Sequence, residues 1–267
     1  MLLERSGNYL IKDIKINKKD VTIYFDNDCI KINKSTYQSF DYLYKGKELT
    51  NEEYDRLVKQ DNLSKYLTYV YSLLSKNRYS EFTIKEKLLL KGAKQEEINS
   101  IISILVEKKL IDDDKLIEDI IDIDNQKLYG KYKILQKLKT KGLVPKNVID
   151  SFPYEKELEK AKLLIEKIEV KYFSHSYNDM IRHIHNYLSN MGYETRVISD
   201  ASSFIKERDQ ENELLNLEKD FKLAIIRHEK ILDEYLLKNK VIKSLMAKGY
   251  LYNDILLCWE EYKHVNK

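Results

Sequence analysis

Residues 134–142 read Ile-Leu-Gln-Lys-Leu-Lys-Thr-Lys-Gly, and the spacing of their apolar residues and glycine occurs four times in the chain. An aliphatic residue stands eight positions before each repeated glycine, a leucine four before it, and another aliphatic residue six after it. The glycines are Gly92, Gly142, Gly192 and Gly249, and their partners are Ile84, Leu88 and Ile98; Ile134, Leu138 and Val148; Ile184, Leu188 and Ile198; and Val241, Leu245 and Ile255. Sixteen matched positions indicate one structural unit used four times.

Each unit is predicted to contain three helices. Residues four apart lie on one face of a helix, so the two apolar residues before each glycine predict a helix with a buried face. A glycine directly after such a helix adopts the left-handed conformation without the strain that a Cβ would add. The glycines are separated by 50, 50 and 57 residues, which fits three helices with short loops. We expect helices over 63–76, 80–91, 94–108, 113–128, 130–141, 145–151, 155–173, 177–191, 194–207, 210–235, 237–248 and 250–264.

The first 35 residues follow a different pattern. Short β-branched and aromatic runs over 11–16, 21–25 and 29–32 are separated by polar turns, which predicts a three-stranded meander. After Asn33 we expect helix to the C-terminus, with a break near Gly46. The fold class is therefore mainly α: tandem three-helix repeats in an elongated curved array, with a small N-terminal β meander. The expected parts are the meander 1–35, a helical connector 36–62, and repeats 63–110, 111–152, 153–207 and 208–267.

Composition excludes several classes of protein. Seven glycines and two prolines in 267 residues are too few for a β-sandwich or barrel built on tight turns. The N-terminal residues lack the pattern of a signal peptide, and no apolar run reaches the ~18 residues of a membrane helix, so we expect a cytoplasmic protein without a membrane partner. Cys29 and Cys258 could form one bridge, but two free thiols are expected in a reducing compartment.

No catalytic motif is present in the sequence. Neither GxGxxG nor GxxxxGK[ST] occurs, so no phosphate-binding loop is indicated. His183 and His185 point about 200° apart on a helix and cannot share a metal ion. Asp112, Asp113 and Asp114 open a predicted helix, where acids cap free N–H groups, and the acidic residues of 207–220 suggest a solvated helix face. We expect no enzyme activity, no cofactor and no metal site.

Charge is segregated in the second repeat, although the net charge is only +3. Residues 112–124 carry seven acids and one lysine, whereas 127–146 carry seven lysines and no acid. A lysine-rich helix is either a solvated face or a contact for an anionic partner, either phosphates or an acidic protein groove. The candidate binding residues are Arg78, Lys85, Lys87, Lys91, Lys131, Lys133, Lys137, Lys139 and Lys141.

The order of short motifs over residues 76–150 resembles the RecX family of regulatory proteins. The motifs are Arg78-Tyr-Ser80-Glu81, Lys87-Leu88, Lys91-Gly92, Ile98, Leu110-Ile111-Asp112-Asp113, Tyr129-Gly130, Ile134, Leu138 and Lys141-Gly142. The N-terminal extension and the length are similar to the longer RecX proteins of low-GC Gram-positive bacteria. The chain departs from the family pattern at Leu116-Ile117, where an aromatic-Ala pair is usual, and at Asn190-Met191-Gly192.

The resemblance implies a non-enzymatic regulator that binds the RecA–single-stranded DNA filament. Such proteins inhibit RecA filament growth, ATPase, strand exchange and coprotease activity. The expected partners are therefore the RecA filament and, weakly or through RecA, single-stranded DNA, and the chain is expected to be a monomer. The alternative from the residues alone is a helical-repeat module that binds single-stranded nucleic acid directly.

Overall fold

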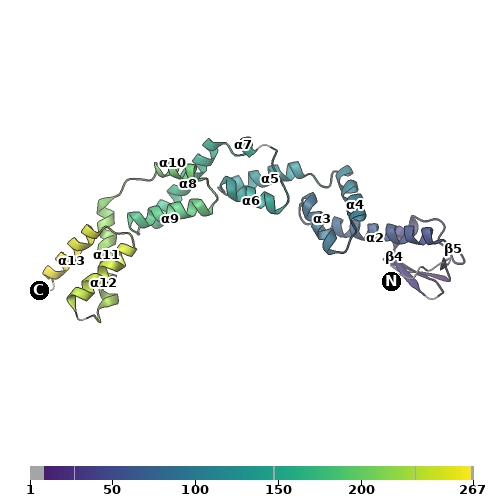
Figure 1. Ribbon diagram of the computed structural model, residues 1–267, viewed down its shortest axis with the longest axis horizontal. Coiled ribbons are helices and arrows are strands. Elements are labelled where there is room, and N and C mark those ends of the chain that lie inside the picture. The colour runs from purple at the N-terminus through teal and green to yellow at the C-terminus, as the bar shows by residue number, and fades with distance from the viewer. Residues whose placement is uncertain (1–8, 27, 147, 232, 266–267) are drawn as a thin grey trace. The chain divides into compact units, whose positions relative to one another are not determined.

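The computed structural model describes residues 9–26, 28–146, 148–231 and 233–265. The first eight residues of the predicted meander region and the side chain of Val148 lie outside this description. The chain divides into two compact units, one formed by Met1–Leu116 with Lys141–Leu143 and the other by Ile117–Thr140 with Val144–Lys267. The prediction of a mainly helical protein with small N-terminal antiparallel strands is confirmed (Figure 1).

The N-terminal part contains the predicted meander and one further strand pair. Strands β2 (Asp13–Ile16), β3 (Asp20–Tyr24) and β4 (Cys29–Asn33) form an antiparallel sheet in that order. Strand β1 (Tyr9–Leu10) pairs with β5 (Glu48–Leu49), which follows the predicted break near Gly46 at a place where helix was predicted to resume. Helix α1 (Lys34–Gln38) is short, and the chain turns at Gly46, whose φ of +93° suits a glycine. The sequence misses β5 because a two-residue strand carries no periodicity.

Helix α2 (Asn51–Leu74) begins twelve residues earlier than the predicted first helix of repeat 1. Thr50 and Glu53 form a capping box at its start, a local signal that fixes where the helix begins. The other helices of repeats 1 and 2 are α3 (Glu81–Leu90), α4 (Gln95–Glu107), α5 (Asp113–Gln126), α6 (Lys131–Thr140) and α7 (Val148–Ser151). Repeats 3 and 4 contain α8 (Tyr154–Tyr172), α9 (Tyr177–Asn190), α10 (Thr195–Ser202), α11 (Gln210–His228), α12 (Glu234–Ala247) and α13 (Tyr252–Val265).

The repeat positions form the cores of the repeats. The two apolar residues before each glycine are 0% exposed in all four repeats. The following apolar residue is also buried at each position that the structure describes, namely Ile98, Ile198 and Ile255. The four glycines have φ between +67° and +93°, as predicted for residues that end a helix in the left-handed conformation.

A docking contact joins each repeat to the next, and it involves the backbone N–H groups at the starts of the middle helices α3, α6 and α9. The N–H of the first residue of α3 donates to Asp113 of the next repeat at 3.0 Å. The corresponding N–H groups of Lys131 and Tyr177 donate to Glu157 at 2.9 Å and Glu213 at 2.8 Å. Free N–H groups at a helix start need such acceptors, and a carboxylate also complements the helix dipole.

The same helix starts also contact the glycine turn of the following repeat. The hydroxyl of Ser80 donates to the Lys141 carbonyl, and the hydroxyl of Ser176 donates to the Lys248 carbonyl. Gly130 uses its own N–H, which donates to the Met191 carbonyl at 2.8 Å. We call each set of contacts a repeat junction; there is one between repeats 1 and 2, one between 2 and 3, and one between 3 and 4.

The buried acids of the junctions correct one prediction. Glu213 belongs to the acidic stretch 207–220 that was expected to be a solvated face, yet it is 4% exposed. Burial raises the pKa of the Asp113 and Glu213 carboxyls, although the N–H donors oppose this effect. Asp112 behaves as predicted, because its carboxylate accepts from the Lys115 N–H at the start of α5.

Two glycine substitutions distinguish the stability cost of the left-handed turn from the cost of disturbing the repeat junction. In Gly92→Ala the new Cβ has no neighbour within 4 Å, so only the φ of +83° costs stability, about 1–2 kcal/mol. In Gly192→Ala, at a φ of +84°, the Cβ would lie 2.4 Å from the Lys133 backbone nitrogen. We expect a further loss of about 1–3 kcal/mol for this overpacking. Urea unfolding followed by circular dichroism measures both, and equal losses would contradict the junction's role.

Candidate interaction surface

The predicted basic residues lie mainly on α3 and α6. These two helices have the same burial pattern, position by position, over Glu81–Leu90 and Lys131–Thr140. Their buried residues are the repeat positions Ile84, Leu88, Ile134 and Leu138, so the lysines project from the remaining faces. The surroundings of each lysine differ, however, and they decide which ammonium groups are available to a partner.

Lys137 pairs with a buried carboxylate of its own repeat. Its Nζ lies 2.8 Å from both oxygens of Asp124, which is 0% exposed, and Lys127 is 3.7 Å from the same carboxylate. A buried carboxylate without a cation would be costly, so Lys137 stabilises the fold. The acidic and basic runs of repeat 2 therefore neutralise each other in part.

Lys131 and Lys133 lie at the junction between repeats 2 and 3. The Lys133 ammonium is 4.3 Å from the centre of the Tyr129 ring and 3.8 Å from the sulfur of Met191. Lys131 donates its backbone N–H to Glu157, and its ammonium lies 3.9 Å from Glu194. Both side chains are half-buried, so they contribute to packing as well as to surface charge.

The α3 lysines have weaker partners. Lys85 forms an i,i+4 ion pair with Glu81. The ammonium groups of Lys87 and Lys91 lie over the rings of Tyr79 and Tyr69, at 5.3 Å and 5.2 Å from the ring centres. Both tyrosines are half-buried. A cation over such a ring keeps its charge, and the interaction is worth about 0.5–2 kcal/mol.

The remaining predicted residues are Arg78, Lys139 and Lys141. Arg78 precedes α3 and also interacts with a neighbouring group. Lys139 is exposed in the last turn of α6, where a cation complements the helix dipole. Lys141 is half-buried, and its carbonyl oxygen accepts the Ser80 hydroxyl in the junction between repeats 1 and 2.

Exposed leucines accompany the α3 lysines, and the sequence analysis missed them. Leu90 is 88% exposed and Leu89 is 55% exposed. The repeat pattern could have identified them, because only Leu88 of Leu88-Leu89-Leu90 falls at a core position. We call Lys87, Leu90 and Lys91 the α3 patch, since Leu90 is three residues from Lys87 and next to Lys91. Basic and apolar groups in one patch suit a protein partner with acidic and apolar groups.

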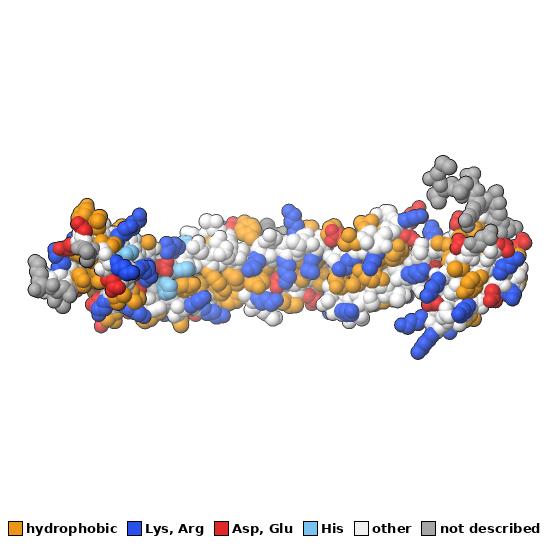
Figure 2. All heavy atoms as spheres, turned by 90° about the horizontal axis from the view of Figure 1, so that it is seen from below, with side chains coloured by type: hydrophobic (Ala, Val, Ile, Leu, Met, Phe, Trp, Pro, Cys, Tyr) orange, Lys and Arg blue, Asp and Glu red, His pale blue; other side chains and the backbone are white. Residues whose placement is uncertain are grey.

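Figure 2 shows the same mixture more widely, with basic side chains scattered among hydrophobic ones on the face that it presents. No helix in the part of the chain that the structure describes is long and apolar enough to cross a membrane. Cys29 and Cys258 are free thiols, and burial raises the pKa of Cys258 to about 11. An unreactive thiol is consistent with a packing role for Cys258.

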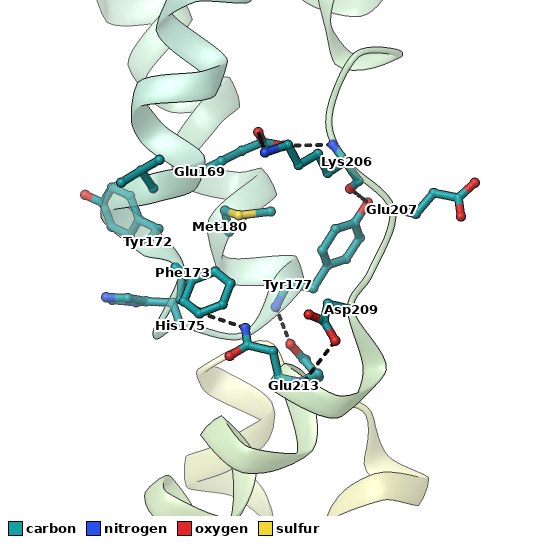
Figure 3. Close-up of a pocket in the computed structure, with 12 residues that line it drawn as sticks. Glu169, Tyr172, Phe173, His175, Tyr177, Met180, Lys206, Glu207, Asp209 and Glu213 are labelled. Atoms are coloured by element: carbon teal, nitrogen blue, oxygen red, sulfur yellow. Dashed lines mark hydrogen bonds and ion pairs between the residues drawn. The ribbon is translucent and has the colours of Figure 1, made fainter.

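A pocket of about 200 Å³ lies among α8, α9, α11 and the segment before α11 (Figure 3). Tyr172, Phe173 and Met180 form part of its apolar wall. Two of its carboxylates are paired within the chain: Glu169 accepts from the Lys206 N–H at 2.7 Å, and Glu213 accepts from the Tyr177 N–H at 2.8 Å. The pocket therefore belongs to the junction between repeats 3 and 4.

Comparison with known proteins identifies relatives over most of the chain. No model of a known protein family matches it. The chain is 29% identical over 220 residues to the regulatory protein RecX of Oceanobacillus iheyensis, covering 80% of each protein. It is 28% identical over 262 residues to RecX of Lactococcus lactis subsp. lactis, covering 94% of this chain and 96% of the relative. RecX of Clostridium tetani is 27% identical over 244 residues, covering 90% and 87%.

A crystal structure of a regulatory protein RecX shares the fold. It superposes with a TM-score of 0.56 at 23% identity, covering 74% of this chain and all of the other. The fold thus defines a mainly helical repeat protein. The relatives, mostly from low-GC Gram-positive bacteria, allow a more specific statement. The chain belongs to the RecX family.

Charge reversal should distinguish structural from surface lysines on α6. Lys137→Glu leaves Asp124 with only the more distant ammonium of Lys127, and we expect the free energy of unfolding to fall by about 2–4 kcal/mol. The loss is somewhat less than for a fully buried pair because the Lys137 side chain is 40% exposed. Lys139→Glu should change stability by less than about 0.5 kcal/mol. Urea unfolding of the two variants tests this, and similar losses would rule out the structural role of Lys137.

Proposed function

We propose that the chain regulates RecA by binding the RecA–single-stranded DNA filament. The observation that carries the proposal is the similarity to RecX proteins over as much as 94% of the chain. On this proposal the protein inhibits filament growth and, with it, RecA ATPase, strand exchange and coprotease activity. Regulation acts through binding, without a catalytic step or cofactor in this protein.

The repeat architecture supports binding to a polymer of identical subunits. Each repeat presents its own exposed surface, so one chain can make several separate contacts. Contacts that are individually weak become strong when one molecule makes several of them at once. A filament offers neighbouring copies of one site, whereas free RecA offers a single copy, so the filament is the preferred partner.

The α3 patch is our proposed principal contact with RecA. Its two ammonium groups rest on tyrosine rings and are not neutralised by carboxylates, and Leu90 between them is 88% exposed. Burial of Leu90 would supply apolar contact area, while Lys87 and Lys91 would orient the complex toward acidic groups. Lys139 and Lys141 are secondary candidates, since Lys133 and Lys137 are engaged within the fold.

The test is the single-stranded-DNA-dependent ATPase of RecA from the same organism, titrated with this protein at physiological salt. Inhibition at less than one molecule per RecA protomer is expected. The variant Lys87→Glu/Lys91→Glu should raise the concentration for half-inhibition roughly tenfold, because like charges would then face the acidic partner. Circular dichroism should show the same helix content as the unchanged protein.

A matched control is Lys240→Glu/Lys243→Glu on α12, which changes the net charge equally at two exposed lysines of repeat 4. Its inhibition curve should match that of the unchanged protein. Equal loss in both variants would mean that only net charge matters. Absence of RecA inhibition, combined with tight and steeply salt-dependent binding to bare single strands, would favour the direct nucleic-acid module instead.

A further inference from the structure

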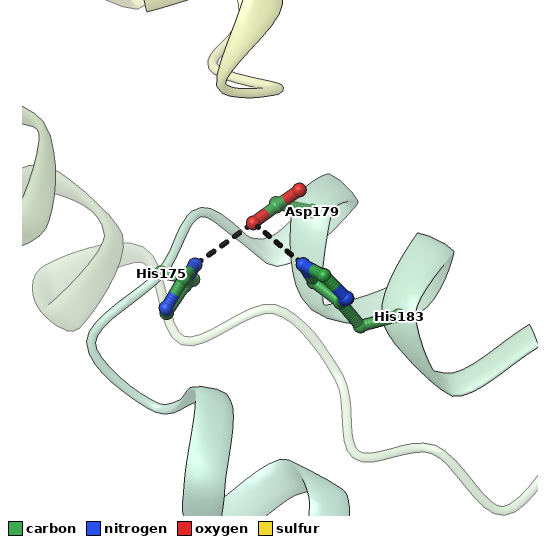
Figure 4. Close-up of side chains that lie close together, drawn as sticks. All are labelled: His175, Asp179 and His183. Carbon is green, nitrogen blue, oxygen red and sulfur yellow. Dashed lines mark hydrogen bonds and ion pairs between the residues drawn. The ribbon is translucent and has the colours of Figure 1, made fainter. Parts of the chain in front are cut away.

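Three metal-ligating side chains converge at the start of α9 (Figure 4). His175 lies just before the N-cap residue Ser176, Asp179 lies in the first turn, and His183 lies one turn later. The Nδ1 atom of His175 is 2.8 Å from the Asp179 carboxylate, and the Nε2 atom of His183 is 3.5 Å from the same oxygen. The three ligand atoms all lie within 4.8 Å of one another.

The surrounding structure holds these side chains in place. The ring of Tyr172 stacks on His183 at 4.2 Å and meets His175 edge-on at 4.9 Å. The backbone N–H of Asp179 donates to the Ser176 hydroxyl, which also donates to Lys248 in the junction between repeats 3 and 4. Contacts of this kind orient ligand side chains before an ion binds.

We infer that His175, Asp179 and His183 form a binding site for a divalent transition-metal ion of the zinc class. Two imidazoles and one carboxylate are ligands that Zn²⁺ prefers, and three protein ligands leave a fourth position open. At bond lengths of about 2.0–2.1 Å, tetrahedral ligands are about 3.3 Å apart. The distances of 2.8 Å and 3.5 Å therefore need only small adjustments.

Asp179 directs one of its two carboxylate oxygens at the histidines. Arg182 contacts one carboxylate oxygen, and both histidines face the other. The histidine side chains are 45% and 40% exposed, so an ion can enter from solvent.

The site predicts a defined proton balance. An ionised carboxylate only accepts hydrogen bonds, so Nδ1 of His175 carries the proton that is directed at Asp179. A bound ion would occupy the Nδ1 position, and the neutral ring would then carry its single proton on Nε2.

The sequence predicts no metal site, because His183 and His185 point about 200° apart on a helix. Residues 175, 179 and 183 are each four apart, a spacing that places ligands on one side of a helix and its N-terminal extension. His175 lies outside the helix and reaches the other two ligands because the chain turns at Phe173 and Ser174, which only the structure shows. The inference is independent of the proposed regulation of RecA.

The test is a titration of the untagged full chain with ZnCl₂, in which isothermal titration calorimetry measures the heat of binding. One equivalent of Zn²⁺ should bind, and Co²⁺ in its place should give the intense absorption bands of tetrahedral coordination. His183→Phe keeps a ring against Tyr172 but removes both nitrogens, and His175→Gln removes the second imidazole. Each variant should weaken binding by about a hundredfold or more, at or above the upper end of what loss of a residue that only orients a ligand costs.

The matched control is His185→Gln, since His185 lies on the same helix and contacts Ser202 at 3.2 Å instead. Its zinc affinity should equal that of the unchanged protein, and circular dichroism checks that all variants keep their helix content. No saturable binding to the unchanged protein would overturn the inference. Equal weakening in all three variants, or none in His175→Gln and His183→Phe, would do the same.

Discussion

The repeated structure depends on the docking of one helix start onto the glycine turn of the next repeat. At the start of three middle helices, a backbone N–H donates to a carboxylate of the following repeat. The residue just before each helix donates, through a hydroxyl or its own N–H, to a carbonyl of that repeat's glycine turn. The approach is close enough that a Cβ on Gly142, Gly192 or Gly249 would lie under 3 Å from the docked residue. No repeat precedes Gly92, so only its left-handed backbone conformation requires a glycine there. In the later repeats the same position ends one helix and leaves room for the helix start of the preceding repeat.

The docking contacts also explain why several charged residues are unavailable to partners. Glu157 is 4% exposed at its junction, where Lys160 donates to Asn125 and the Tyr129 carbonyl at 2.8 Å and 2.7 Å. Asp124 and Lys137 similarly neutralise each other inside repeat 2. The acidic and basic runs that are separate in the sequence therefore partly neutralise each other through ion pairs within the folded repeat. Partner binding is left to groups such as the α3 patch, whose cations rest on rings.

Repeat 3 shows how one unit can acquire chemistry that the others lack. His183 stands nine residues before the turn glycine of repeat 3. The residue at this position is Thr83 in repeat 1 and Lys133 in repeat 2. Neither residue can complete a ligand set, so the His175, Asp179 and His183 cluster is particular to this repeat among the first three. The shared backbone positions the side chains, while the residue types at a few exposed positions decide what each repeat binds.

The sequence by itself determined the repeat, the buried helix faces and the left-handed glycines, because these follow from spacings within about fifteen residues. It also indicated the β meander, whose short runs and turns are local. Tertiary structure alone decided the fate of Lys137, the burial of Glu213, the pairing of β1 with β5 and the meeting of His175 with His183. Each of these depends on which residues, far apart in the sequence, come together in a low-dielectric interior or at a junction. The spacing of residues along the sequence does not specify these tertiary contacts.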